Sequence, residues 1–72
     1  MTERNKTMTH HLTPKQIEVM RCLAQGMPNK LIAYKMGIRT STVKVHLNRI
    51  YTRLNITNRL QALLWLTEHG IF

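Results

Sequence analysis

The fold of this 72-residue chain is decided by residues 28–54, PNKLIAYKMGIRTSTVKVHLNRIYTRL. Within this stretch, Ile32, Ala33 and Met36 have the i, i+1, i+4 spacing of a helix that buries one face. Gly37 follows them, and glycine enters the left-handed conformation at a helix end without a Cβ penalty. A second amphipathic segment begins directly after the glycine. A short helix, a tight turn and a longer helix form a helix-turn-helix.

The second helix of the pair is expected at about residues 41–54. Thr40, Ser41 and Thr42 offer an N-cap and a first turn rich in hydroxyls. At 100° per residue, four apolar side chains share a narrow arc and are expected in the core: Val43, Leu47, Ile50 and Leu54. The opposite arc is polar and basic.

That opposite arc is suited to approach an anion, and its side chains can pair with the edges of DNA bases. Lys44 can donate to guanine O6 and N7, Asn48 can pair with the adenine N6/N7 edge, and Val45 can contact a thymine methyl. No acid occurs between Glu18 and Glu68. The start of the helix adds unpaired N–H groups and a positive dipole end for phosphates.

A family resemblance follows from these residues. The run from Leu12 to Phe72 resembles the LuxR-type helix-turn-helix, most of all the effector domains of NarL-type response regulators, through GMPNKLIA, STVKVH and WLTEHGIF. The resemblance implies an all-α, four-helix fold and a bacterial transcription regulator that binds double-stranded DNA. Its base-contacting positions correspond to Lys44, Val45 and Asn48. Since the family often has a cation at the place of Asn48, specificity there is expected to differ.

Eight further residues are expected to contact DNA phosphates. They are polar or basic and lie near the two helices: Asn29, Lys30, Thr40, Ser41, Thr42, His46, Arg49 and Arg53. Asn29 is expected to cap the first helix of the pair or to present its N–H to a phosphate. RNA polymerase is a further partner that a transcription regulator of this kind can have.

The remaining helices are predicted from their caps. Thr13, Pro14 and Gln16 form a T-x-x-Q capping box with proline at the first helical position. This first helix is expected to bury a stripe comprising Ile17, Met20, Leu23 and Ala24, with Cys22 off the stripe as a small packing residue. The last helix is expected at residues 58–69, capped by Thr57 and ended by Gly70.

The last helix is predicted to have two apolar arcs. One arc, with Ala62 and Trp65, faces the core. The other is expected to form a dimer interface, as the resemblance also implies: Leu60, Leu63, Leu64 and Thr67. The alternative is that these leucines cover an edge of the monomer core. A homodimer on DNA is the expected assembly.

Length and composition restrict the other possibilities. The chain has 11 Lys and Arg against 3 Asp and Glu, a formal charge of +8 that is typical of polyanion binding. Residues 12–72 allow one small domain, and residues 1–11 are expected to be a disordered arm. One cysteine, no signal peptide and no apolar run of about 18 residues predict a cytoplasmic protein.

Other classes of function fit less well. No paired carboxylates, nucleophile–base set or glycine-rich phosphate loop is visible, so the chain is not expected to be an enzyme, nor to hold a metal, a cofactor or a small-molecule ligand. His10 and His11 lack spaced partners for a metal site. The aromatic residues are too scattered for RNA stacking. Region 4 of sigma factors has a similar helix-turn-helix and stays the structural rival. Whether the chain is an excised effector domain or a free-standing regulator is left open.

Overall fold

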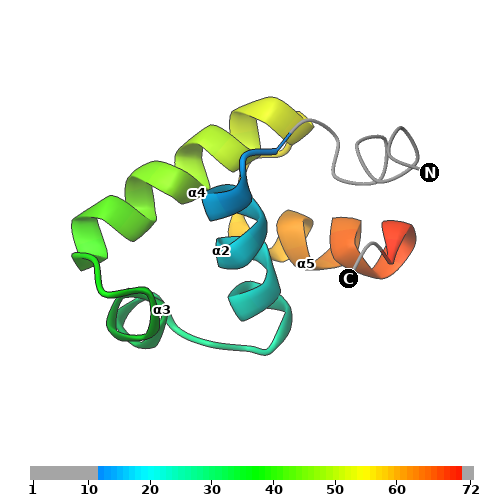
Figure 1. Ribbon diagram of the computed structural model, residues 1–72. Coiled ribbons are helices and arrows are strands. Elements are labelled where there is room, and N and C mark those ends of the chain that lie inside the picture. The colour runs from blue at the N-terminus through cyan, green and yellow to red at the C-terminus, as the bar shows by residue number, and fades with distance from the viewer. Residues whose placement is uncertain (1–11, 71–72) are drawn as a thin grey trace.

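The structure, a computed structural model, describes residues 12–70 and is all-α over that range. It contains four helices: α2 (Pro14–Ala24), α3 (Asn29–Met36), α4 (Thr40–Leu54) and α5 (Arg59–His69) (Figure 1). The four-helix prediction is therefore confirmed. Within the described range no helix has the length and apolarity required to cross a membrane. The predicted disordered arm, with His10 and His11, lies outside the described residues.

Helix α4 is the longest element and organises the others. It runs across one side of the domain and packs on α3 and α2, while α2 also packs on α5 (Figure 1). Helix α3 lies near the start of α4, and α5 lies on the other side of α2. One side of α4 is thereby covered and the opposite side is left to solvent.

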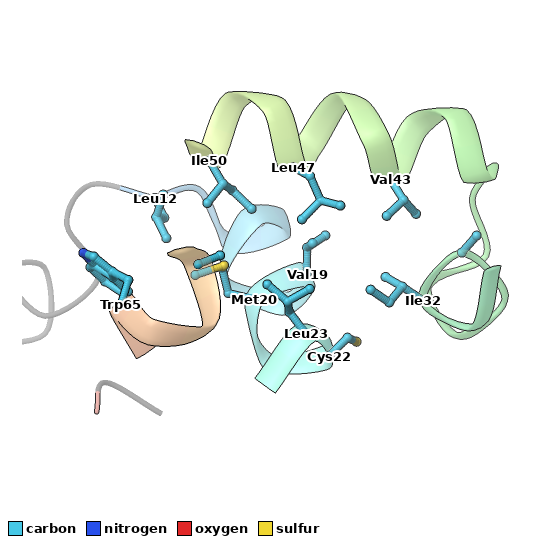
Figure 2. Packing of buried hydrophobic residues seen from close by; sticks show 12 residues of the cluster. Leu12, Val19, Met20, Cys22, Leu23, Ile32, Val43, Leu47, Ile50 and Trp65 are labelled. Atoms are coloured by element: carbon cyan, nitrogen blue, oxygen red, sulfur yellow. The ribbon is translucent and has the colours of Figure 1, made fainter. Parts of the chain in front are cut away.

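The core forms between α4 and the three shorter helices. In Figure 2, Val43 points from α4 toward Ile32 of α3, while Leu47 and Ile50 point toward Val19 and Met20 of α2. The three α4 residues were predicted to be buried, and they are; Leu54 is half-buried against the same cluster. Trp65 of α5 is 9% exposed and completes the core at the other end.

Helix α2 has its predicted capping box but a different buried face. The Thr13 hydroxyl accepts from the Gln16 N–H at 3.1 Å, and the Gln16 side chain accepts from the Thr13 N–H at 3.0 Å. Cys22 is buried at 1% exposure, which confirms it as a small packing residue but shows that its placement off the buried stripe was wrong. Ala24, expected inside, is exposed. Because α2 is covered from more than one side, its buried arc is wider than a single stripe.

The turn between α3 and α4 matches its prediction, but the caps do not. Gly37 has φ +68°, the left-handed conformation expected at this helix end. The N-cap of α3 is Pro28, not Asn29, and the N-cap of α4 is Arg39, not a residue of the hydroxyl run at 40–42. Neither N-cap makes a side-chain hydrogen bond. Helix α4 thus begins within one residue of its predicted start.

Helix α5 begins one residue later than predicted. Asn58, not Thr57, is its N-cap, and the Asn58 side chain accepts from the Gln61 N–H at 2.9 Å. Thr57 instead donates its own N–H to the Gln61 side chain at 2.8 Å. The preceding turn is made by Asn55 at φ +59°, a conformation that asparagine tolerates better than most residues. Gly70 ends the helix as predicted.

Candidate nucleic-acid interface

The outward face of α4 brings together the three predicted base readers. Lys44, Val45 and Asn48 are all exposed, on the opposite side from Val43, Leu47 and Ile50. Val45 is 44% exposed, although valine is among the residue types that are most often buried. The fold therefore leaves one apolar and two polar side chains together on a convex, accessible surface.

The predicted phosphate contacts fall into two groups. Those with exposed side chains are Lys30, Thr40, Ser41, Arg49 and Arg53. Those with half-buried side chains are Asn29, Thr42 and His46. The exposed group lies at the starts of α3 and α4 and along α4 itself, which also carries the predicted base readers.

The starts of α3 and α4 lack the side-chain cap that the starts of α2 and α5 have. No partner occurs within residues 12–70 for the N–H groups of Asn29 and Lys30 at α3, or of Thr40 and Ser41 at α4. Neither helix has an acidic residue in its first turn. Unpaired N–H groups at a helix start, with the positive end of the macrodipole, bind phosphate well.

Arg59 is a structural residue that the sequence analysis missed. Its guanidinium donates to the Asn29 side-chain oxygen at 2.9 Å and also to the Met27 carbonyl oxygen. These bonds join the start of α5 to the loop before α3. The Arg59 bond occupies the Asn29 side-chain oxygen, so the Asn29 side-chain amide and its backbone N–H are the donors left to meet a phosphate. A basic residue in a first helical turn, where the macrodipole disfavours it, was the available signal.

The electrostatics of this surface favour a polyanion. Neither α3 nor α4 contains an acid, and the described carboxylates are Glu18 of α2 and Glu68 of α5. Burial raises the pKa of the Tyr51 hydroxyl above its usual value of 10.0, and the nearby Arg59 charge partly opposes that rise. Tyr51 therefore stays neutral at physiological pH and adds no negative charge to α4. Within residues 12–70, no three metal-ligating side chains come together.

The outward side of α5 is apolar. Leu60 is 65% exposed and Leu64 is 56% exposed. Leu63, predicted to lie on the same surface, is half-buried and packs against the core. Thr67 is exposed and donates its hydroxyl to the Leu63 carbonyl at 3.1 Å. The alternative reading, that these leucines cover the core, therefore holds for Leu63 and not for the other two.

The fold and the basic outward face of α4 define a helix-turn-helix DNA-binding domain of the kind found in transcription regulators. Comparison with known proteins agrees: residues 10–66 match the family described as "Bacterial regulatory proteins, luxR family". The chain belongs to this family.

Three relatives illustrate the range of similarity. The Escherichia coli K12 "Nitrate/nitrite response regulator protein NarL" is 37% identical over 99% of this chain and 32% of its own length. The Bacillus subtilis "Transcriptional regulatory protein YdfI" is 35% identical over 96% of this chain and 31% of its own length. The Pseudomonas putida "Glycerol metabolism activator" is 45% identical over 74% of this chain and 24% of its own length. The chain thus spans about a third or less of the length of these relatives.

Proposed function

We propose that this chain binds double-stranded DNA sequence-specifically, with α4 in the major groove. The carrying observation is the outward face of α4, where Lys44, Val45 and Asn48 are exposed together on an acid-free helix whose other side fills the core. The two polar side chains supply donors and an acceptor for base edges, and the valine supplies an apolar contact for a thymine methyl.

Phosphate contacts fix α4 in register on the duplex. The unpaired N–H groups at the starts of α3 and α4 support contacts from Asn29, Lys30, Thr40 and Ser41. Arg49 and Arg53 extend the basic surface along α4. Thr42 and His46 are half-buried beside the base readers and reach phosphates from there. Contacts of this kind position a protein on DNA without carrying sequence information.

Two copies pair through α5 when both are bound to DNA. Exposed Leu60 and Leu64, with Thr67 beside them, form the apolar surface that supports pairing, and Leu63 forms its inner edge. This surface is smaller than a standard interface, so pairing in free solution is weak and DNA supplies much of the dimerisation by raising effective concentration. The two half-sites lie about 10 bp apart, centre to centre, which is one helical turn.

The regulatory setting is the control of transcription. The chain acts as the effector domain of a response regulator or as a regulator in its own right, and its similarity to regulators across about a third or less of their lengths supports both.

The test is selection of binding sequences from a random duplex pool, followed by titration at several salt concentrations. Neutralisation of about four to six phosphates predicts a slope of log K against log salt of about −4 to −5 per bound domain. A flat salt response would remove the electrostatic part of the proposal. A pool that yields no preferred sequence would remove sequence-specific reading.

A further inference from the structure

A groove lies between the start of α2 and the second half of α4. It is lined by side chains from both helices: Thr13, Gln16, Asn48, Arg49, Thr52 and Arg53. We call it the α2–α4 groove. It contains two arginines and no acid, and Asn48 joins it to the outward face of α4. A duplex positioned by that face would therefore pass along the groove.

Gln16 is the unusual member of this lining. It is 7% exposed and is the buried polar side chain of the described core. Its orientation is fixed, because its Oε1 accepts from the Thr13 N–H at 3.0 Å. Its Nε2 amide donates no hydrogen bond within the described chain. Every fully buried side-chain nitrogen and oxygen of the described residues has a hydrogen-bond partner, so Nε2 is not fully buried. The Nε2 group is therefore in contact with solvent, and Gln16 is one of the residues that line the groove.

The remaining polar atoms determine what this space can hold. The acceptor oxygens of Thr13 and Gln16 are both occupied in the capping box. The Thr52 hydroxyl donates to the Asn48 carbonyl at 3.1 Å. Arg49 makes no hydrogen bond or ion pair with the rest of the described chain. The groove thus presents donors from Gln16 and a cation from Arg49, which suits a ligand with several acceptor oxygens and a negative charge.

We propose that the α2–α4 groove binds a backbone phosphate of the duplex, and that Gln16 on α2 donates to it beside Arg49 on α4. The inference rests on the proposed function, since α4 must first place the duplex. It extends the DNA-contacting surface beyond the helix-turn-helix to a helix that no sequence motif marks for DNA binding. The neighbouring cap also fixes the position of the Gln16 amide, so little conformational entropy is lost on binding.

Gln16→Glu tests the role of the amide directly. A carboxylate still accepts from the Thr13 N–H and favours the start of α2, so the fold is retained. It replaces the donor with a negative charge, and we expect about a tenfold loss of affinity for a mixed-sequence 20-bp duplex. The magnitude of the salt slope should fall by about 0.9, the value for one phosphate.

Gln61→Glu is the matched control. Gln61 stands at the same position of α5, and its side chain likewise accepts a backbone N–H, from Thr57 at 2.8 Å, but it does not line the groove. The two variants carry the same change in net charge. Affinity should change less than about twofold for Gln61→Glu. Salt at 0.15 M largely screens the interaction between exposed charges that lie farther apart than the Debye length of about 8 Å.

A variant that gains affinity provides a test that misfolding cannot imitate, because an unfolded variant would lose affinity. Thr52 is exposed in the groove wall, and Thr52→Lys should raise duplex affinity several-fold. Gln25 is exposed outside the groove, and Gln25→Lys should not raise it. Equal losses for both glutamate variants, or equal gains for both lysine variants, would overturn the groove site and leave the proposed function standing. Failure of the unsubstituted chain to bind duplex at any salt concentration would overturn both.

Discussion

Helices α4 and α5 have similar inward faces and opposite outward faces. Each buries its apolar residues in the same core, through Ile50 on α4 and Trp65 on α5. Outward, α4 exposes Lys44 and Asn48, while α5 exposes Leu60. The inward faces determine the fold, and the outward faces are the basis of the two proposed kinds of binding: a polyanion for α4 and a second apolar surface for α5.

The N-termini of the two helices also differ, because α5 has a side-chain cap and α4 has none. The start of α5 is closed by the Asn58 side chain, which accepts from the Gln61 N–H, and by Thr57, which donates to the Gln61 side chain. The start of α4 has no side-chain cap. A cap stabilises a helix by about 1 kcal/mol, so an uncapped start sacrifices stability. At α4 the Thr42 N–H bonds the Arg39 carbonyl in place of a capping side chain, and the N–H groups of Thr40 and Ser41 have no partner in the described chain.

The largest expected effect concerns the inward face. Ile50 is fully buried and Leu60 is 65% exposed, so truncation to alanine should change the free energy of unfolding by different amounts at the two positions. Ile50→Ala should lower the free energy of unfolding by about 2–5 kcal/mol through lost burial and a cavity. Leu60→Ala should change it by no more than about 0.5 kcal/mol, as is usual for surface sites. Urea unfolding followed by circular dichroism measures both; similar values would show that Leu60 belongs to the core.

The next effect concerns pairing through α5. Leu64→Glu would place a carboxylate against its symmetry mate in the paired complex, while the monomer core stays intact because Leu64 is exposed. Affinity for paired half-sites should fall by about a hundredfold, the lower end of the avidity that linked sites provide. Affinity for a single half-site should be retained. Gln25→Glu, at the exposed C-cap residue of α2, controls for the added charge. Unchanged binding to paired sites would place the interface elsewhere.

A smaller effect concerns the bond between α5 and the start of α3. Arg59→Ala removes hydrogen bonds from a charged donor to Asn29 and to the Met27 carbonyl, and should cost about 1.5–3 kcal/mol of stability. Arg59→Lys keeps the charge but not the planar fork, so it should recover part of that loss. Full recovery by lysine would show that charge alone matters at this position.

The smallest effects concern base reading by α4. Lys44→Ala should reduce discrimination at one base position by about 1–3 kcal/mol, and Asn48→Ala should do so at a different position. Binding assays across single-base variants of a selected site provide the measurement. If Lys44→Ala weakened binding equally on every variant, Lys44 would be a phosphate contact and not a reader.

Much of this fold was predictable because its signals are local. The capping box at Thr13 and Gln16, the glycine at 37 and the apolar spacing of α4 each depend on neighbouring residues. What failed depends on tertiary packing. The burial of Cys22 follows from helices that cover α2 from more than one side, and the contacts of Arg59 join positions about 30 residues apart in sequence.

The candidate site divides in the same way. The exposure of the predicted base readers could be inferred from the periodicity of α4, because the side opposite a buried stripe is exposed. The caps of α3 and α4 could not be assigned, since proline and arginine are not preferred N-caps and the hydroxyls at 40–42 offered better ones. The groove beside Gln16 depends on how α2 meets α4, which no local pattern encodes.

The most direct test of the central claim is a nuclear magnetic resonance titration of the ¹⁵N-labelled chain with a duplex carrying one selected half-site. The amide signals of Lys44, Val45 and Asn48, and those at the starts of α3 and α4, should move on binding. The signals of Leu60 and Leu64 should stay in place, because a single half-site recruits no second copy. Movement concentrated on α5, with the outward face of α4 unchanged, would contradict the assignment of α4 to DNA.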